Sequence, residues 1–258
     1  MNSAFIIIGL SGLLLIGMLV FIDLGYRIGR SRRVRNPDSS TEGAGAVDAA
    51  VFGLLGLTLA FTFSGASERL AVRRAQIVQE ANAIGTAYLR VDMLPSAEQP
   101  PIRALFRQYL QSRVEVFDKL PDRTASNAAL NKSNQIQREI WSRSVLACQN
   151  APNPATCMLV MTALNDMIDI TTTRTMATLI HAPLIIIALL VMLSFLGALL
   201  SGYTMSIQPR RNPLHMLLFA LAISSTVYVV LDLEYPRVGL INLTSMDRAI
   251  VELREMMK

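Results

Sequence analysis

Few side chains of this 258-residue sequence have types and spacings that could do chemistry. The only two cysteines, Cys148 and Cys157, enclose a short proline-containing stretch, CQNAPNPATC. This spacing predicts a disulfide formed in an oxidising compartment, with two unpaired thiols as the alternative. The two histidines, His181 and His215, lie beside or inside apolar runs, so we expect no metal site.

Two aspartates, Asp166 and Asp169, are three residues apart and would share one face of a helix. Paired carboxylates can hold a cation or exchange protons, but no histidine or third carboxylate lies nearby in the sequence. An ion pair with basic residues of another helix is the favoured interpretation. No GxSxG, HExxH, CxxC or phosphate-binding glycine loop occurs, so we expect neither an enzyme nor a bound cofactor.

A further candidate lies in the apolar stretch GLLGLTLAFTFSGASER, which begins at Gly53. Wound as a helix, this stretch has one stripe that is weakly polar in the membrane and cationic where the helix leaves it. The stripe is a candidate pore lining that would favour anions, although threonine hydroxyls commonly bond to their own backbone. Its members are Thr58, Thr62, Arg69 and Arg73.

Small residues of the same helix form a second, narrow face, on which helix backbones can approach closely within or between subunits. This helix-packing face consists of Gly53, Gly56, Ala60 and Ser64. The first apolar stretch of the chain also suits close helix contact, through Gly9, Gly12 and Gly17.

The elements that must position these side chains are predicted to be membrane helices. The sequence is 52% hydrophobic and 17% charged, and its mean hydropathy is +0.41, which is typical of a multi-pass membrane protein. Uncharged runs long enough to cross the hydrocarbon core predict four spans. These are Met1–Ile22, Ala49–Ser67, a core within Leu179–Tyr203, and Asn212–Leu231. The net charge of +5 comes mostly from arginines that flank the spans, so we expect no nucleic-acid partner.

No proline interrupts the sequence between Gly53 and Arg90, so we predict that the second span continues as one long helix into water. Beyond the membrane its apolar residues form a seam for a partner helix, at Ile77, Ala81, Ile84, Tyr88 and Val91. Three amphipathic segments follow before the third span. The sequence therefore predicts an all-α fold, with a large helical bundle inserted between the second and third of four transmembrane helices.

These elements divide the chain into four parts. Residues 1–66 form a first transmembrane hairpin with an arginine-rich cytoplasmic loop, and residues 67–178 form the extramembrane bundle. Residues 179–236 form a second transmembrane hairpin, and residues 237–258 an amphipathic C-terminal helix.

A cluster of charges ends the fourth span, at Asp232, Glu234 and Arg237. Charge at the membrane interface marks a functional hypothesis. Arg69 and Arg73 are the expected partners of its carboxylates, if their helix leaves the membrane beside this one.

Arginines also predict the orientation in the membrane. Five arginines follow the first span, and Arg210 and Arg211 lie in the short loop between the third and fourth spans. Short arginine-rich loops stay in the cytoplasm, so we expect the central bundle and both termini in the periplasm of a bacterial inner membrane. The cysteine pair agrees with an oxidising compartment for the bundle.

Four stretches, in this order along the chain, together resemble one family: GLLGLTLAFTFSGASER, EANAIGTAYLRVDMLP, ALNDMIDITTTR and LDLEYPRVGL. They resemble the bacterial bestrophin-like membrane proteins, a family of unknown function, over about residues 53–257. The resemblance implies four membrane helices with a large helical insert between the second and third. Its label further implies an oligomeric ion channel, because bestrophins are pentameric anion channels. Bestrophins keep their helical part in the cytosol, whereas the arginines and cysteines of this chain predict it outside.

Two functional hypotheses follow. In the first, the chain is a homo-oligomer in the lipid bilayer that conducts small ions, with a preference for anions. In the second, it is a non-conducting sensor or scaffold whose extramembrane bundle binds a partner, and the seam from Ile77 to Val91 is a partner surface.

Overall fold

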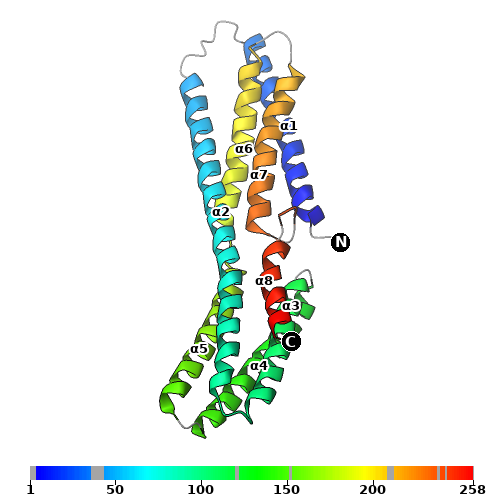
Figure 1. Cartoon of the computed structure of the whole chain (residues 1–258). Helices are drawn as coiled ribbons and strands as arrows, with labels where there is room; N and C mark the ends of the chain where they lie inside the picture. Colours follow the sequence, from blue (N-terminus) through cyan, green and yellow to red (C-terminus); the bar gives the residue numbers. More distant parts are fainter. Residues whose placement is uncertain are drawn as a thin grey trace. The chain divides into compact units, whose positions relative to one another are not determined.

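The protein is all-α in the computed structural model, over the residues that the structure describes (Figure 1). These are residues 4–35, 44–119, 122–150, 153–207, 212–236, 239–241 and 243–257. The helices are α1 (Ala4–Arg35), α2 (Ala44–Arg90), α3 (Gln99–Asp118), α4 (Arg123–Gln149), α5 (Pro154–Ala177), α6 (Leu184–Met205), α7 (Pro213–Glu234) and α8 (Thr244–Met256), with a 3-10 turn at Val91–Met93.

Four of the described helices, α1, α2, α6 and α7, are long and apolar enough to cross a membrane. The predicted all-α class with four candidate spans is therefore confirmed. The chain forms two compact units, which are Met1–Leu70 with His181–Asn242, and Ala71–Ile180 with Leu243–Lys258. The division of the chain into four parts stays a prediction.

The arginines after the first span belong to a helix rather than to a loop. Helix α1 continues to Arg35, so Arg27, Arg30, Arg32 and Arg33 lie on its last turns. Arginine is a good helix former, and Arg27 Nε lies 2.6 Å from Asp23 Oδ2 one turn earlier, which supports the extension. Residues 36–43, which follow α1, and Arg210 and Arg211 are outside the described residues.

In the first unit, α1 packs against α6 and α7 around an apolar core that includes Leu14, Met18, Leu193 and Val227. Glycines allow the backbones of α1 and α6 to touch. A Cβ atom at Gly25 would overlap the carbonyl oxygen of Leu199, and one at Gly202 would overlap that of Ile22. Close backbone approach is how membrane helices associate where lipid removes the hydrophobic driving force.

The glycines predicted for this contact are only partly the right ones. A Cβ atom at Gly9 or Gly12 would meet nothing within 4 Å, whereas one at Gly17 would press on the ring of Phe195. The close approach depends instead on Gly25, which lies one turn beyond the predicted span.

The membrane part of α2 is the least covered of the four spans. Of the most apolar stretch of α2, only 11% is buried within the chain, compared with 22% for the corresponding stretches of α1 and α7 and 28% for that of α6. It touches the core through Leu55, which is buried, and through Phe52, whose ring lies edge-on to that of Phe219 with centroids 5.8 Å apart.

In the second unit, α3 packs against α4 and α8, and α4 packs against α5. The C-terminal part of α2 contacts α3, α5 and α8 through side chains. The buried core includes Phe106, Leu110, Ile140 and Met167. Four of the five predicted seam residues of α2 are buried in this core, and Tyr88 is partly buried. The seam is therefore interior to one chain, which removes it as the partner surface of the sensor hypothesis.

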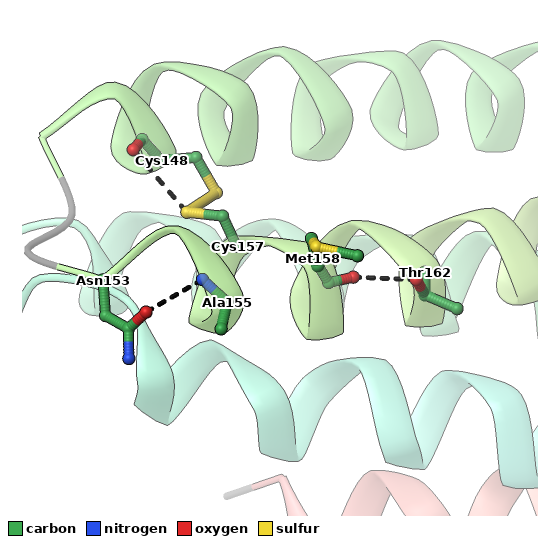
Figure 2. The surroundings of a disulfide bond; sticks show 6 residues. All are labelled: Cys148, Asn153, Ala155, Cys157, Met158 and Thr162. Atoms are coloured by element: carbon green, nitrogen blue, oxygen red, sulfur yellow. Dashed lines mark hydrogen bonds between the residues drawn. A yellow bond between two sulfur atoms is a disulfide. The ribbon is translucent and has the colours of Figure 1, made fainter.

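Capping residues and a disulfide define the ends of α4 and α5. The Asp122 carboxylate accepts hydrogen bonds from the backbone N–H groups of Thr124 and Ala125 at the start of α4. At its other end, α4 is joined to α5 by a disulfide between Cys148 and Cys157, whose Cα atoms are 5.5 Å apart (Figure 2). The short stretch between the cysteines thus links two antiparallel helices.

We expect Gly202→Ala to destabilise the protein strongly and Gly12→Ala to leave it unchanged. The added methyl group at position 202 has no space beside the carbonyl oxygen of Ile22, so α1 and α6 must separate. Overpacking of this kind costs about 1–3 kcal/mol or more. Thermal unfolding of the purified protein in detergent measures the difference, and equal melting temperatures for the two variants would contradict this account.

Candidate functional site

The threonines of the polar stripe use their hydroxyl groups on their own helix. The Thr58 hydroxyl donates to the Leu54 carbonyl oxygen at 2.7 Å, and the Thr62 hydroxyl donates to the Thr58 carbonyl oxygen at 2.8 Å. Thr62 is buried within the chain, whereas Thr58 is partly exposed. Of the two, only Thr58 keeps surface that an ion could reach.

The helix-packing face of α2, a face of small residues, is not covered by the rest of the described chain. A Cβ atom at Gly53 or Gly56 would meet nothing within 4 Å, and Ala60 and Ser64 are exposed. No part of the described chain packs closely on this face, so a single chain leaves it to lipid or to another molecule.

Glu234, at the end of α7, is the centre of a charge cluster in the first unit. Its side chain is 3% exposed, and its carboxylate accepts from Arg69 Nε at 3.1 and 3.0 Å and from Arg69 Nη2 at 2.6 Å. This fork geometry is the strongest form of the carboxylate–guanidinium pair. The expected pairing of this cluster with Arg69 is confirmed.

The same carboxylate connects α7 to the start of α6. Glu234 Oε1 accepts from the backbone N–H of Ala182 at 2.8 Å and lies 3.4 Å from His181 Nδ1. The His181 ring stacks on that of Tyr235, with centroids 4.6 Å apart. Arg69, Glu234 and His181 thus bring three spans together at one end of the first unit.

Asp232 does not share these partners, although it is two residues away. Its Oδ2 accepts from the backbone N–H groups of Leu240 and Ile241 at 3.1 and 3.2 Å, and it lies against Gly239, where a Cβ atom would overlap the carboxylate. Asp232 therefore shapes the turn that follows α7. Arg237, the third member of the predicted cluster, lies outside the described residues.

Arg73, the last arginine of the predicted stripe, bonds to backbone carbonyl groups within the second unit, and its pairing with the cluster at Glu234 stays a prediction. Its Nε donates to the carbonyl oxygen of Ala177 at 3.1 Å and its Nη2 to that of Ile180 at 2.8 Å. These carbonyl groups belong to the end of α5 and the residues after it, where helix carbonyls lack partners within the helix. Arg73 is buried there and acts as a cap of α5.

A second charge cluster, which was not predicted from the sequence, lies in the core of the second unit. The Glu80 carboxylate of α2 accepts from Arg113 Nε of α3 at 2.5 Å and from Arg174 Nη1 of α5. The exposed fractions of the three side chains are 0%, 0% and 3%. We call this group the Glu80 cluster.

Aromatic groups enclose the Glu80 cluster. The guanidinium carbon of Arg174 lies 3.5 Å from the centroid of the Phe117 ring, and that of Arg113 lies 5.2 Å from it. The Tyr109 hydroxyl lies 2.8 Å from Thr171 Oγ1, and burial raises the pKa of Tyr109 to about 12. Burial is the largest single influence on the pKa of Arg113 and lowers it, but the charge of Glu80, the influence of Tyr109 and the hydrogen bond to Glu80 together outweigh burial and raise that pKa. The arginine therefore stays charged inside the bundle.

A signal for this cluster was present in the sequence. Glu80 lies between Ile77 and Ile84 at helical spacing, so it falls on the apolar seam rather than on the solvated face. A carboxylate in an apolar stripe needs a buried cation, and the arginine that supplies it follows only from the tertiary structure.

The remaining candidates show no further site. Asp169 accepts from the amide of Asn165 at 2.9 Å on the exposed side of α5, so the expected ion pair of this aspartate with another helix is not seen. Within the described part of the chain, no three histidine, cysteine, aspartate or glutamate side chains gather as metal ligands would.

We expect Glu80→Gln to lower the free energy of unfolding by about 3–5 kcal/mol, because it leaves two buried guanidinium groups without their carboxylate. Glu139→Gln, an exposed change on α4, is the matched control and should stay within about 0.5 kcal/mol of the parent protein. Chemical unfolding in detergent, followed through Trp141, gives both values. Similar stabilities for the two variants would show that the Glu80 cluster does not hold the bundle together.

This chain matches one known protein family and several solved structures. The family described as Bestrophin-like domain matches residues 5–245. Among solved structures, a variant of a bacterial bestrophin homolog from Klebsiella pneumoniae has a TM-score of 0.71 at 14% identity, and the alignment covers 96% of this chain and 98% of that one. A second structure of a bestrophin homolog from Klebsiella pneumoniae has a TM-score of 0.66 at 13% identity, covering 94% and 98% of the two chains.

A structure described only as a membrane protein variant has a TM-score of 0.66 at 14% identity, with 94% of this chain and 98% of that chain covered. No curated protein matches the sequence. At these identities the structures show a shared fold, whereas the family match covers nearly the whole chain. The chain belongs to the Bestrophin-like family.

Proposed function

We propose that this protein is an ion channel of the bacterial inner membrane, built as a symmetric homo-oligomer that conducts small ions and prefers anions. The observation that carries the proposal is the uncovered membrane part of α2, of which only 11% is buried within the chain. A helix with an open face of small residues suits close packing against a second copy. Family membership supports the same proposal, because bestrophins are known as anion channels.

In the proposed channel, the α2 helices surround the ion pathway. The predicted lining consists of Thr58, Thr62, Arg69 and Arg73. Thr62 and Arg73 are covered by their own chain, so we assign ion contact to Thr58 and to Arg69, whose side chain is 28% exposed. A ring of such arginines, one from each subunit, would raise the local concentration of anions.

We further propose that the helical insert between the second and third spans lies in the periplasm. Two features support this orientation: the arginines Arg27 to Arg35 at the end of the first span, and the disulfide between Cys148 and Cys157. Cytoplasmic reductants would keep such a pair reduced.

The charge of Arg69 should set ion selectivity. With purified protein in planar bilayers, we expect Arg69→Gln to reduce the chloride-to-potassium permeability ratio by about threefold or more, because it removes one cation per subunit from the pathway. The reversal potential in a KCl gradient measures this ratio. Arg143→Gln, an exposed change on α4 in the second unit, should leave it unchanged.

A charge exchange separates selectivity from stability, since Arg69 also pairs with Glu234. The double variant Arg69→Glu/Glu234→Arg keeps an ion pair at this place but moves the cation to α7. A changed reversal potential with intact assembly supports the pore assignment. An unchanged reversal potential places Arg69 in a purely structural role, and an assembled protein without conductance favours the sensor or scaffold hypothesis.

Labelling of the two cysteines tests the orientation. After mild reduction of intact spheroplasts with an impermeant reductant, we expect an impermeant maleimide to label Cys148 and Cys157, because both lie in the proposed periplasmic unit. Arg30→Cys in a background without these cysteines is the control and should react only after lysis. Labelling of Cys148 and Cys157 only after lysis would place the bundle in the cytosol.

A further inference from the structure

Several buried polar atoms in the core of the second unit have no hydrogen-bond partner within the described part of the chain. Within the described part of the chain, no hydrogen-bond partner is found for Gln76 Oε1, Arg113 Nη1, Arg113 Nη2, Ser133 Oγ, Gln137 Nε2 and Ser144 Oγ. Native proteins rarely leave such groups unpaired, and an enclosed water molecule or ion commonly satisfies them.

Arg113 is the most demanding of these residues. Its Nε donates to Glu80, but both of its amino groups remain free although the side chain is fully buried. Its contact with the Phe117 ring involves the face of the guanidinium, so it satisfies none of the N–H bonds in the plane. An unpaired buried cationic donor is among the most costly groups that a protein interior can hold.

The register of α3 and α4 predicts that Ser133 lies near the level of these amino groups. The Ser126 hydroxyl of α4 donates to the Val116 carbonyl oxygen of α3 at 2.8 Å, which sets the antiparallel register. Because the two helices are antiparallel, Ser133, seven residues after Ser126 on α4, lies at the level of Tyr109, seven residues before Val116 on α3. Side chains lean towards the N-terminus of their helix, so the long Arg113 side chain reaches from its own position towards that level.

The chemistry of these atoms selects the ligand. The two Arg113 amino groups and Gln137 Nε2 can only donate hydrogen bonds, and the hydroxyls of Ser133 and Ser144 can also donate one. Gln76 Oε1 can only accept, and it is not part of the proposed site. Arg113 and Arg174 create a positive potential that repels a cation. Since Arg113 is fully enclosed, the ligand must also be small.

We propose that the core of the bundle binds one small inorganic anion of halide size, held by the amino groups of Arg113 with the Ser133 hydroxyl beside them. The ligand lies on the side of the guanidinium opposite to the bond that Nε makes with Glu80. The site lies within one chain, so it does not depend on conduction or on oligomer formation. Its role is to stabilise the bundle.

The test uses the purified full-length protein, with chloride exchanged for gluconate at constant ionic strength. We expect the melting temperature to rise by several degrees, about 3–6 °C, as chloride increases from 1 to 300 mM, because an anion that binds only the folded state stabilises it. Arg113→Gln should abolish this rise, whereas Arg138→Gln, an exposed change on α4, should keep it.

A second variant should change the affinity in the opposite direction. Glu80→Gln removes the negative charge that lies beside the same guanidinium and repels an anion, so we expect half-saturation at an about tenfold lower chloride concentration. This outcome separates a specific site from general salt effects, which would change little in either variant.

Bromide provides a measurement that needs no variant. Crystals of the unmodified protein soaked in bromide should show an anomalous peak beside the Arg113 amino groups. A melting temperature independent of chloride, or water alone at this position in bromide-soaked crystals, would overturn the proposal.

Discussion

The buried carboxylate of Glu80 is the interaction on which the second unit depends. It accepts from an arginine of α3 and an arginine of α5, while Glu80 itself belongs to α2. The three helices come from separate parts of the chain, and α2 is also the helix that carries the second span. A carboxylate between two guanidinium groups in an apolar interior has few alternative arrangements, because any displacement leaves a buried charge unpaired. The arrangement therefore imposes one register on the three helices.

The first unit is held by a different device. Its helices are apolar on all sides, so burial from water distinguishes poorly between alternative packings within a bilayer. Backbone contact at Gly25 and Gly202 selects one packing of α1 on α6, and the fork between Arg69 and Glu234 attaches α2 to the end of α7. The middle of α2 remains uncovered, which leaves the small-residue face free for the assembly that the proposed channel requires.

The four stretches that carry the family resemblance contribute charged residues to both clusters. Arg69 ends the first stretch and pairs with Glu234 of the fourth, and Glu80 begins the second and pairs with Arg174, which ends the third. Distant positions thus meet pairwise, each pair within its own unit. Their shared feature is structural, because each pair joins two residues that lie more than ninety positions apart in the sequence.

The sequence alone determined the all-α class, the four candidate spans and the family, because each depends on composition, on apolar run length or on local motifs. It also identified the buried seam of α2 through its helical periodicity. The tertiary structure decided which glycines touch another backbone, that Arg73 caps α5, and that Glu80 is buried between two arginines. The physical reason is that periodicity specifies the face of a helix on which a residue lies, whereas its partner depends on how distant helices pack, and no local pattern encodes that packing.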